Sequence, residues 1–326
     1  MTIRLFIRNL FVQTPYALVT DLTGKHVIVT GTSRGSLGFE TAKTLARWGA
    51  VVIVTTRSNT ESVIRALTEE LSGENTKAQI TGHELDLCDA ESVNAFAQWY
   101  MEQCGQRLDV LVNNAGVHLD LMSKWKQPKL TADGHEIQWR TNYLGTAQLT
   151  HKLLPLLQTT AAAQGEARIV NVGSQIHNKG SNAALFNPDT PYNSWQSYGL
   201  SKLGLIHLTS ELHRQFAQND NLKSYCLHPG SASGTYTGVA DKGFEGQAVI
   251  NFLRKLGAPI EKLFMSTAEE GAQTQLFCAT SAQAESGSYY QNCAIHEAST
   301  DSQDEKAATH LWQETLDWVN GLPDSN

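Results

Sequence analysis

The feature that most restricts the fold is an alternation of short, β-branched apolar runs with amphipathic stretches, which begins at Lys25 and continues through most of the chain. Such alternation is typical of parallel βαβ units, in which a helix follows each buried strand and covers the sheet. We therefore expect a doubly wound α/β domain with a mostly parallel sheet of about seven strands and helices on both faces. The pattern predicts strands at 26–30, 51–56, 79–86, 108–116, 168–174 and 222–230, and helices at 39–50, 60–73, 90–104, 133–158 and 198–217.

The length of 326 residues suits one large α/β domain, and no repeat, low-complexity tract or linker divides the chain. We expect residues 21–326 to form a single domain, with residues 231–265 inserted as a lid. Residues 1–20 mix apolar side chains with Arg4 and Arg8 and are too interrupted for a membrane span. They are expected to form an arm or helix packed on the domain, with a weak peripheral membrane contact as the alternative.

The composition argues against several classes of function. A net charge of −7 gives no sign of the clustered basic face that nucleic acid requires. Five scattered cysteines without a C-x-x-C pair fit a reducing compartment, and the N-terminus lacks the features of a secretory signal. Eleven histidines form no H-x-x-x-H or H-E-x-x-H pattern. We expect a cytoplasmic protein that needs no metal and binds no nucleic acid.

A glycine-rich loop follows the first predicted strand directly, with Gly31, Gly35 and Gly38 ahead of a helical run. Glycines there let backbone N–H groups approach a pyrophosphate closely, and the N-terminus of the helix favours its negative charge. The alternative is an ordinary tight turn, but the position between a buried strand and a helix favours a dinucleotide site.

The end of the second predicted strand indicates which dinucleotide is preferred. An acidic residue there suits the ribose 2′-hydroxyl of NAD, whereas an arginine suits the 2′-phosphate of NADP. The strand ends in Thr55, Thr56 and Arg57, and Arg34 in the glycine loop is a second cation. If these arginines are more than solvated surface charges, they favour NADP(H), with NAD(H) as the alternative cofactor.

Tyr198 and Lys202 are the candidate catalytic pair. Residues four apart lie on one face of a helix, here expected in its first turn. A nearby ammonium group stabilises phenolate and lowers the pKa of a tyrosine toward the range useful for general acid–base catalysis. Ser174, at the end of the preceding strand, is placed to bind a substrate oxygen. A lone Y-x-x-x-K occurs by chance in many chains, and the Ser174 hydroxyl has a backbone partner as its alternative.

These motifs occur in a recognisable order: T-G-x-x-x-G-x-x-G from Thr30, then Asn113-Asn114-Ala115-Gly116, Asn142, Ser174, Tyr198 with Lys202, and Pro229-Gly230. From about Asp21 to Trp312 the chain thereby resembles the short-chain dehydrogenase/reductase family. The 24-residue step from Ser174 to Tyr198, the phrase AEEGAQT and the segment SGSYYQNC followed by LWQE resemble its retinol-dehydrogenase-like branch, which includes relatives of protochlorophyllide reductase.

The resemblance implies a Rossmann-fold catalytic domain and a role for each matching residue. Tyr198 would donate the proton in reduction and accept it in oxidation, while Ser174 orients the reacting oxygen. Lys202 would lower the pKa of the tyrosine and bind the nicotinamide ribose, and Asn142 would support Lys202 through a water.

The same resemblance implies a set of cofactor contacts. Asp86 and Asn113 have alternatives, since Asp86 suits a helix N-cap and Asn113 suits a turn. Departures from the family pattern are a glycine loop one residue longer than usual, Gly173 in place of a serine, and a displaced threonine after Gly230. The full expected set is Gly31, Ser33, Arg34, Gly35, Ser36, Leu37, Gly38, Arg57, Asp86, Leu87, Asn113, Ala115, Gly116, Tyr198, Lys202, Pro229 and Gly230.

The substrate is expected to be a lipophilic ketone or aldehyde, or the corresponding alcohol, of retinoid-, steroid- or polyketide-like structure. His177 and Trp195, between Ser174 and Tyr198, and Tyr236 in the lid are the candidate substrate contacts in a mostly apolar pocket, although such spacing also suits ordinary helix packing. Two other functions stay open: reduction of a carbon–carbon double bond, or regulatory NADP(H) binding without turnover. A homodimer or homotetramer is expected by analogy alone.

Overall fold

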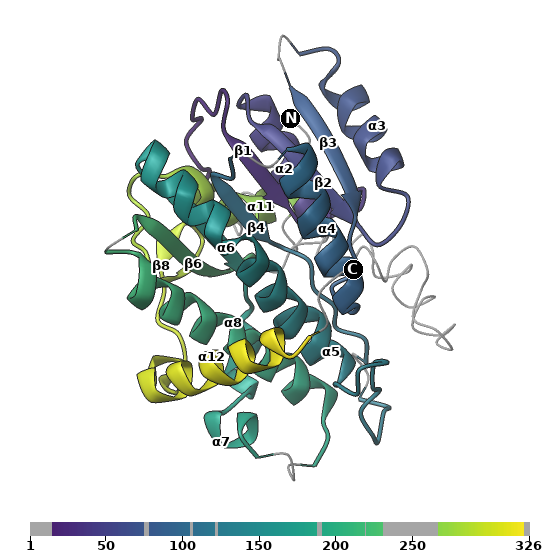
Figure 1. Cartoon of the computed structure of the whole chain (residues 1–326), viewed down its shortest axis with the longest axis vertical. Coiled ribbons are helices and arrows are strands. Elements are labelled where there is room, and N and C mark those ends of the chain that lie inside the picture. Colours follow the sequence, from purple (N-terminus) through teal and green to yellow (C-terminus); the bar gives the residue numbers. More distant parts are fainter. Residues whose placement is uncertain are drawn as a thin grey trace, which may run out of the picture.

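The computed structural model describes residues 15–74, 78–104, 107–120, 123–187, 191–218, 220–230 and 267–322. Their strands form one sheet in the order β3-β2-β1-β4-β5-β6-β7-β8 (Figure 1), in which every neighbouring pair is parallel except β7 and β8. The predicted fold class is confirmed, and the short antiparallel β8 extends the expected sheet. The strands are β1 (His26–Val29), β2 (Val51–Thr56), β3 (Gln79–Glu84), β4 (Val110–Asn113), β5 (Ala167–Val172), β6 (Leu222–His228), β7 (Tyr289–Gln291) and β8 (Ala294–Ile295).

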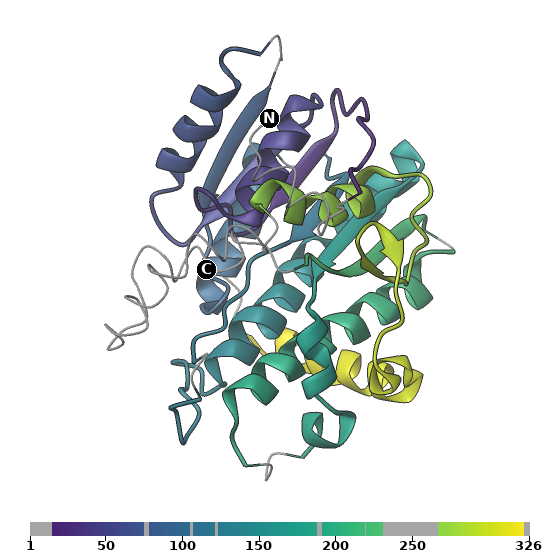
Figure 2. The same cartoon turned by 180° about the vertical axis from the view of Figure 1, so that it is seen from behind.

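Helices cover both faces of the sheet, as Figures 1 and 2 show from opposite sides. One face carries α4 (Ala90–Gln103), α6 (Gly145–Gln164) and α8 (Ser194–Phe216), and α12 (Glu305–Asn320) packs on α8. The other face carries α2 (Leu37–Arg47), α3 (Thr60–Leu71) and α11 (Ala268–Thr280). Short helical turns complete the described chain: α5 (Ile137–Trp139), η1 (Arg140–Leu144), η2 (Gln175–Lys179), α7 (Asn182–Leu185) and η4 (Thr300–Gln303).

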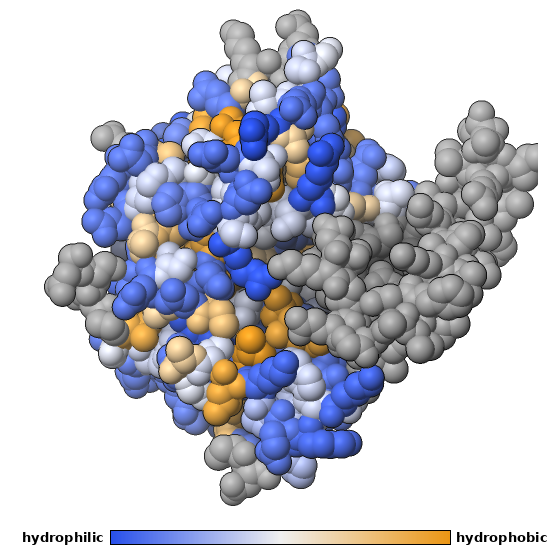
Figure 3. Space-filling model, turned by 90° about the vertical axis from the view of Figure 1, so that its right-hand side faces the viewer, coloured by the Kyte–Doolittle hydropathy of each residue, from blue (hydrophilic) through white to orange (hydrophobic). Residues whose placement is uncertain are grey.

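The core explains why the strand predictions succeed. Successive strand side chains point to opposite faces, so a strand covered on both sides must be apolar throughout. In β1, Ile28 joins the cluster under α4, α6 and α8, whereas Val27 and Val29 join the cluster on the opposite face. On the face shown in Figure 3, hydrophilic side chains dominate among the coloured residues, and hydrophobic ones gather mainly in the lower centre.

The starts of two helices differ by four residues from the sequence-based expectation. The helix expected over 133–158 begins at Ile137, capped by the Glu136 carboxylate, and passes through the π-helical turn η1 before α6. The helix expected to begin at Tyr198 begins at Ser194, because the Asn193 side chain accepts the N–H groups of the two residues after Ser194. Tyr198 therefore lies in the second turn of α8 rather than the first.

The N-terminal segment within the described residues runs beside α11, where the Ala17 N–H donates to Gln273 Oε1 at 3.0 Å. Tyr16, Leu18 and Val19 in this segment are exposed. No helix among the described residues is long and apolar enough to cross a membrane. The predicted lid, residues 231–265, lies outside the described residues and stays a prediction.

Candidate active site

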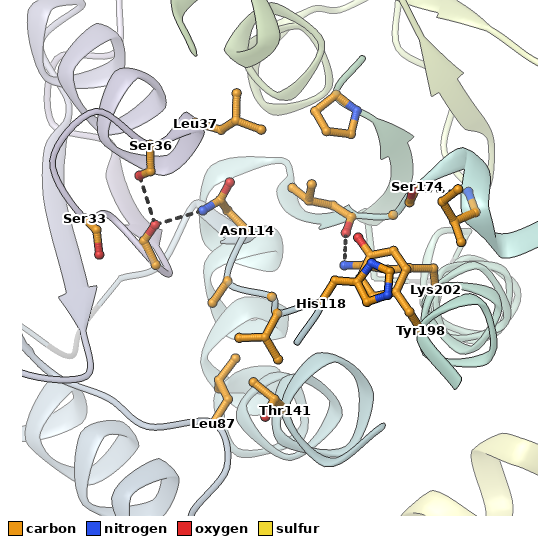
Figure 4. A pocket seen from close by; sticks show the side chains of 18 of the residues that line it. Ser33, Ser36, Leu37, Leu87, Asn114, His118, Thr141, Ser174, Tyr198 and Lys202 are labelled. Carbon is orange, nitrogen blue, oxygen red and sulfur yellow. Dashed lines mark hydrogen bonds between the residues drawn. The ribbon is translucent and has the colours of Figure 1, made fainter. Parts of the chain in front are cut away.

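A cavity of about 420 Å³ lies at the carboxyl ends of the parallel strands, next to the neighbouring strands β1 and β4, from which the chain continues to opposite halves of the sheet. Ligands of open α/β sheets bind at this kind of switch point. Figure 4 shows Ser33, Ser36, Leu37 and Asn114 on one side of the cavity, and Ser174, Tyr198, Lys202 and His118 on the other. The topology has therefore brought the predicted phosphate loop and the predicted catalytic residues to a single site.

The glycine loop forms a close-packed cradle at the start of α2. Gly31 has a φ of +70°, and a Cβ there would lie 2.8 Å from the Cα of Ala115. A Cβ on Gly38 would lie 2.5 Å from the carbonyl oxygen of Gly31 and would also overlap the side chain of Asn114. Ser36 caps α2 by accepting the Phe39 N–H at 3.1 Å. The loop thus presents the N-terminus of an eleven-residue helix to the cavity, a site suited to phosphate.

The asparagine that organises this loop is Asn114 rather than Asn113. The Asn114 Nδ2 donates to the carbonyl oxygens of Thr30 and Gly31 at 2.8 and 3.1 Å. Asn113 is buried instead, where its amide donates to Thr150 Oγ1 and Asn171 Oδ1 and ties β4 to α6 and β5. Asn113 is the last residue of β4 and its side chain is committed to the core, whereas its neighbour Asn114 lines the cavity.

The two predicted arginines differ in position. Arg57 follows β2 directly and lines the cavity, with Thr55 and Thr56 beside it. The Arg34 side chain is 71% exposed, lies 3.9 Å from Glu70 and is outside the cavity lining found among the described residues. Of the expected pair of cations, only Arg57 is placed at the site.

Asp86 and Leu87 line the cavity beyond β3. Asp86 does not cap α4, since Asp89 does that, but its carboxylate accepts the N–H of Cys88 at 2.9 Å. The carbonyl oxygen of Leu87 accepts a hydrogen bond from Arg140 Nη1 at 2.7 Å. The hydrogen bonds from Cys88 and Arg140 therefore fix the turn that Asp86 and Leu87 form.

Lys202 is buried and hydrogen-bonded to the end of β5. Its side chain is 3% exposed, its Nζ donates to the carbonyl oxygen of Val172 at 2.8 Å, and Nζ lies 5.6 Å from the ring centroid of Tyr198. Burial lowers the pKa of Lys202 to about 8. The amine is held beside the phenol by the end of β5 and by its position one turn later on α8.

Ser174 caps the short helix η2, where its hydroxyl accepts the N–H of Ile176 at 3.2 Å, and it lines the cavity near Tyr198. The preceding residue must be small, because a Cβ on Gly173 would lie 2.8 Å from Cys226 Sγ. This contact explains the glycine that replaces the family serine. Ser174 therefore makes the hydrogen bond to the backbone that was considered as its alternative role, and it also lines the cavity.

Asn142 lies in the π-turn η1 and binds the segment that leaves β4. Its Oδ1 accepts the Val117 N–H at 2.7 Å, and its Nδ2 donates to the Val117 carbonyl oxygen and to Ser201 Oγ. A Cβ on Gly116 would lie 3.2 Å from Lys202 Nζ and 3.4 Å from Asn142 Oδ1, so both groups surround that glycine. Asn142 therefore supports the part of the cavity wall that Gly116 and Val117 form.

The predicted substrate contacts have different outcomes. Trp195 lines the cavity, and Tyr236 lies outside the described residues. His177 is only 1% exposed and is not part of the described lining; its Nε2 accepts the Ser299 N–H at 3.0 Å, so its Nδ1 carries the proton and donates to the Ser174 carbonyl oxygen at 2.7 Å. The structure therefore assigns His177 to the support of the Ser174 turn rather than to substrate contact.

Sequence reasoning missed His118, whose imidazole stacks on the ring of Tyr198 with centroids 4.5 Å apart and an interplanar angle of 11°. It follows the Asn-Asn-Ala-Gly motif by two residues, and this proximity to the motif was the available signal. The other described lining residues that were not expected are Thr55, Thr56, Leu85, Asn114, Val117, Leu119, Thr141, Val172, Gly173, Gln175 and Ile176.

Comparison with known proteins identifies the family. A sequence model of the short chain dehydrogenases matches residues 25–243. The chain belongs to the short chain dehydrogenase family. It is 33% identical to retinol dehydrogenase 11 of Homo sapiens over 306 residues, which cover 93% of this chain and 88% of that protein. It is 34% identical to retinol dehydrogenase 12 of Bos taurus and 35% identical to retinol dehydrogenase 14 of Mus musculus, with coverage of 90% and 89% of this chain and 85% and 84% of those proteins.

Solved structures share the fold of this short chain dehydrogenase. An uncharacterized protein from Mycobacterium Paratuberculosis superposes with a TM-score of 0.66 at 28% identity, covering 94% of this chain and 98% of that one. The RhlG/NADP active-site complex of Pseudomonas aeruginosa superposes with a TM-score of 0.59 at 25% identity, covering 82% of this chain and 94% of that one. The chain is therefore a nicotinamide-dependent oxidoreductase that acts on CH–OH or C=O groups.

The described residues fit a nicotinamide dinucleotide. The glycine cradle leaves no room for side chains at Gly31 and Gly38, and the capped N-terminus of α2 faces the cavity. The cavity continues from this cradle to Tyr198 and Lys202, so one extended molecule reaches both ends. Among the described residues, no group of histidine, cysteine and carboxylate side chains is arranged to hold a metal.

Proposed function

We propose that this chain is an NADP(H)-dependent oxidoreductase that interconverts a lipophilic ketone or aldehyde and the corresponding alcohol, with Tyr198 as the general acid and base. The observation that carries the proposal is the convergence of Ser174, Tyr198 and buried Lys202 on the cavity that also contains the phosphate cradle. A phenol beside a buried amine at that point serves proton transfer in a reaction, whereas a binding module does not require one.

The bound nicotinamide would supply or accept the hydride at the substrate carbon. Ser174 donates a hydrogen bond to the substrate oxygen and fixes its position. Tyr198 gives its phenolic proton to that oxygen in reduction and takes it back in oxidation. The Lys202 ammonium favours the phenolate form of Tyr198 through its positive charge, and Asn142 holds the wall that carries Gly116 against this lysine.

The proposed preference for NADP(H) rests on the end of β2. The strand ends in two threonines followed by Arg57, so the position that would hold a ribose-binding carboxylate in an NAD enzyme has none. Arg57 is exposed at the rim, where it can pair with a 2′-phosphate. The bound NADP named for RhlG supports the same assignment.

The substrate class follows from the wall opposite the phosphate cradle. Val117, Leu119, Ile176, Trp195 and Pro229 make this part of the cavity largely apolar. The names of the retinol dehydrogenase relatives support a lipophilic alcohol or carbonyl compound, for which retinoid-, steroid- and polyketide-like molecules are the candidates. Tyr236 and the rest of residues 231–265 are proposed to complete the pocket as a lid.

Cytoplasmic location and assembly into a homodimer or homotetramer remain predictions. All five cysteines are free thiols, which supports a reducing compartment.

The test is NADPH oxidation by the purified chain against a panel of lipophilic ketones and aldehydes, with NADH alongside. Carbonyl reduction that is faster with NADPH at equal concentration supports the proposal. An enone in the panel decides which group is reduced: product with a saturated carbon–carbon bond and an intact carbonyl would replace this proposal with double-bond reduction. NADPH binding without turnover of any compound would indicate a regulatory binding protein.

A further inference from the structure

His118 covers one ring face of Tyr198. The two rings are nearly parallel, with centroids 4.5 Å apart, and the imidazole also meets the Trp195 ring at a centroid distance of 4.4 Å and an interplanar angle of 88°. Figure 4 shows His118 against Tyr198, with Lys202 and Ser174 on the same side of the cavity. All three residues line the same cavity, so His118 contacts both the proposed proton donor and a residue of the proposed substrate wall.

The backbone around His118 is fixed on both sides. Val117 is bound through both its N–H and its carbonyl oxygen by Asn142, and the Leu119 N–H donates to Gln138 Oε1 at 3.2 Å. The next residue, Asp120, accepts the Ser194 hydroxyl through its carbonyl oxygen at 2.7 Å, which ties the segment to the start of α8. These hydrogen bonds therefore fix the position of the segment that carries the imidazole relative to the helix that carries the phenol.

The imidazole contacts Tyr198 through its flat face and carries no charge there. Burial lowers the pKa of His118 to about 4, so the ring is neutral at physiological pH. Its Nε2 is buried and has no hydrogen-bond partner among the described residues. A buried nitrogen without a partner costs stability, and a ring kept at that cost against Tyr198 points to a role in the site.

We propose that His118 is a positioning residue, which fixes the plane of the Tyr198 phenol by stacking and keeps Trp195 at a set distance from it. This inference rests on the proposed function. A tyrosine side chain turns about two single bonds, and only part of that range directs its hydroxyl at an oxygen held by Ser174. A flat ring packed on the phenol removes the other orientations before substrate arrives, and small misplacements of a catalytic group are known to cost large factors in rate.

The kinetic test compares His118→Ala, which removes the stacked ring, with His118→Phe, which keeps a flat ring and removes both nitrogens. His118→Ala should lower kcat by about 10- to 100-fold while the KM for the carbonyl substrate changes by less than about threefold. His118→Phe should restore most of kcat. A matched control is His83→Ala, because His83 also packs against an aromatic ring, that of Trp99 at 4.9 Å, but lies outside the described cavity lining.

A second measurement reads the stack without turnover. Protein labelled with 3-fluorotyrosine gives a fluorine resonance for Tyr198, assigned by its loss in Tyr198→Phe. In the wild type and in His118→Phe this resonance should be displaced from that of the free amino acid by the stacked ring, and in His118→Ala it should move back toward it.

The inference is wrong if His118→Ala leaves both kcat and the fluorine shift unchanged, or if His118→Phe is as slow as His118→Ala, since the nitrogens would then matter rather than the stack. If the wild type reduces no carbonyl compound, the proposed function fails, and the fluorine shifts alone still decide whether His118 positions Tyr198.

Discussion

Replacement of Lys202 by methionine tests the electrostatic part of the mechanism. Methionine keeps most of the side-chain volume but removes the charge beside Tyr198. Nζ lies 5.6 Å from the ring centroid, and at an effective dielectric constant of about 20 the attraction between an ammonium and a phenolate at that distance is about 3 kcal/mol. Loss of that attraction in the transition state corresponds to a rate factor on the order of 100.

The assay is alcohol oxidation at saturating NADP⁺, followed from pH 6 to pH 10. The Lys202→Met profile should lie below that of the wild type at neutral pH, with its rise shifted to higher pH, because the phenolate forms less readily. Burial lowers the pKa of Lys202 to about 8, so the wild-type amine loses its charge above that pH. The difference between the two profiles should therefore shrink as the pH rises through that value.

Two controls separate the charge from other effects of the substitution. Lys43→Met removes an amine that lies 5.7 Å from the ring centroid of Phe39, outside the described lining of the cavity, and should change the rate by less than about twofold. The affinity for NADPH is measured separately, since Lys202 is also expected to contact the cofactor. The reasoning is refuted if Lys202→Met keeps the wild-type profile, or if its whole defect is repaired by more cofactor.

Three further predictions address the cofactor site and the core. Gly38→Ala should weaken NADPH binding by more than about tenfold, measured by fluorescence titration, because the added Cβ overlaps Asn114 and the Gly31 carbonyl. An unchanged affinity would contradict the claim that the glycine loop binds the cofactor. Arg57→Ala should raise the KM for NADPH about tenfold or more and leave that for NADH nearly unchanged; equal effects on both would remove the argument for NADP(H). Burial lowers the pKa of His207 to about 4 from its ordinary 6.5, so the unfolded chain binds the proton first and stability falls as the pH drops from 6.5 toward 4. His207→Gln should make the loss of Tm over that interval smaller, and an unchanged pH dependence would refute this assignment.

The sheet was predictable because strands buried on both faces must be apolar throughout, and the Val- and Ile-rich runs leave little choice of element. Helix starts were less predictable, since they depend on capping. Asn193 extends α8 by one turn ahead of Tyr198, and that cap became clear only in the structure. The two-residue β8 is too short to leave a periodic signal, and it forms only because β7 offers it an edge.

The candidate site was predictable where a motif specifies a backbone role. The glycine loop, Tyr198 and Lys202 belong to that class. Side-chain direction was not predictable: one step along the chain separates Asn113, which points into the core, from Asn114, which binds the loop.

The same limit applies to the histidines. His177 and His118 are both histidines that follow a motif residue by a few positions, but only the tertiary packing assigns the first to the Ser174 turn and the second to the ring of Tyr198.

The central claim is that Tyr198 transfers the proton, at a site where the rest of the cavity supplies most of the affinity for the dinucleotide. The most direct test is Tyr198→Phe, assayed for carbonyl reduction at saturating NADPH together with its NADPH dissociation constant. The account predicts a loss of kcat of about 10²- to 10⁴-fold with nearly unchanged cofactor affinity. Near-normal turnover by the phenylalanine variant would contradict it.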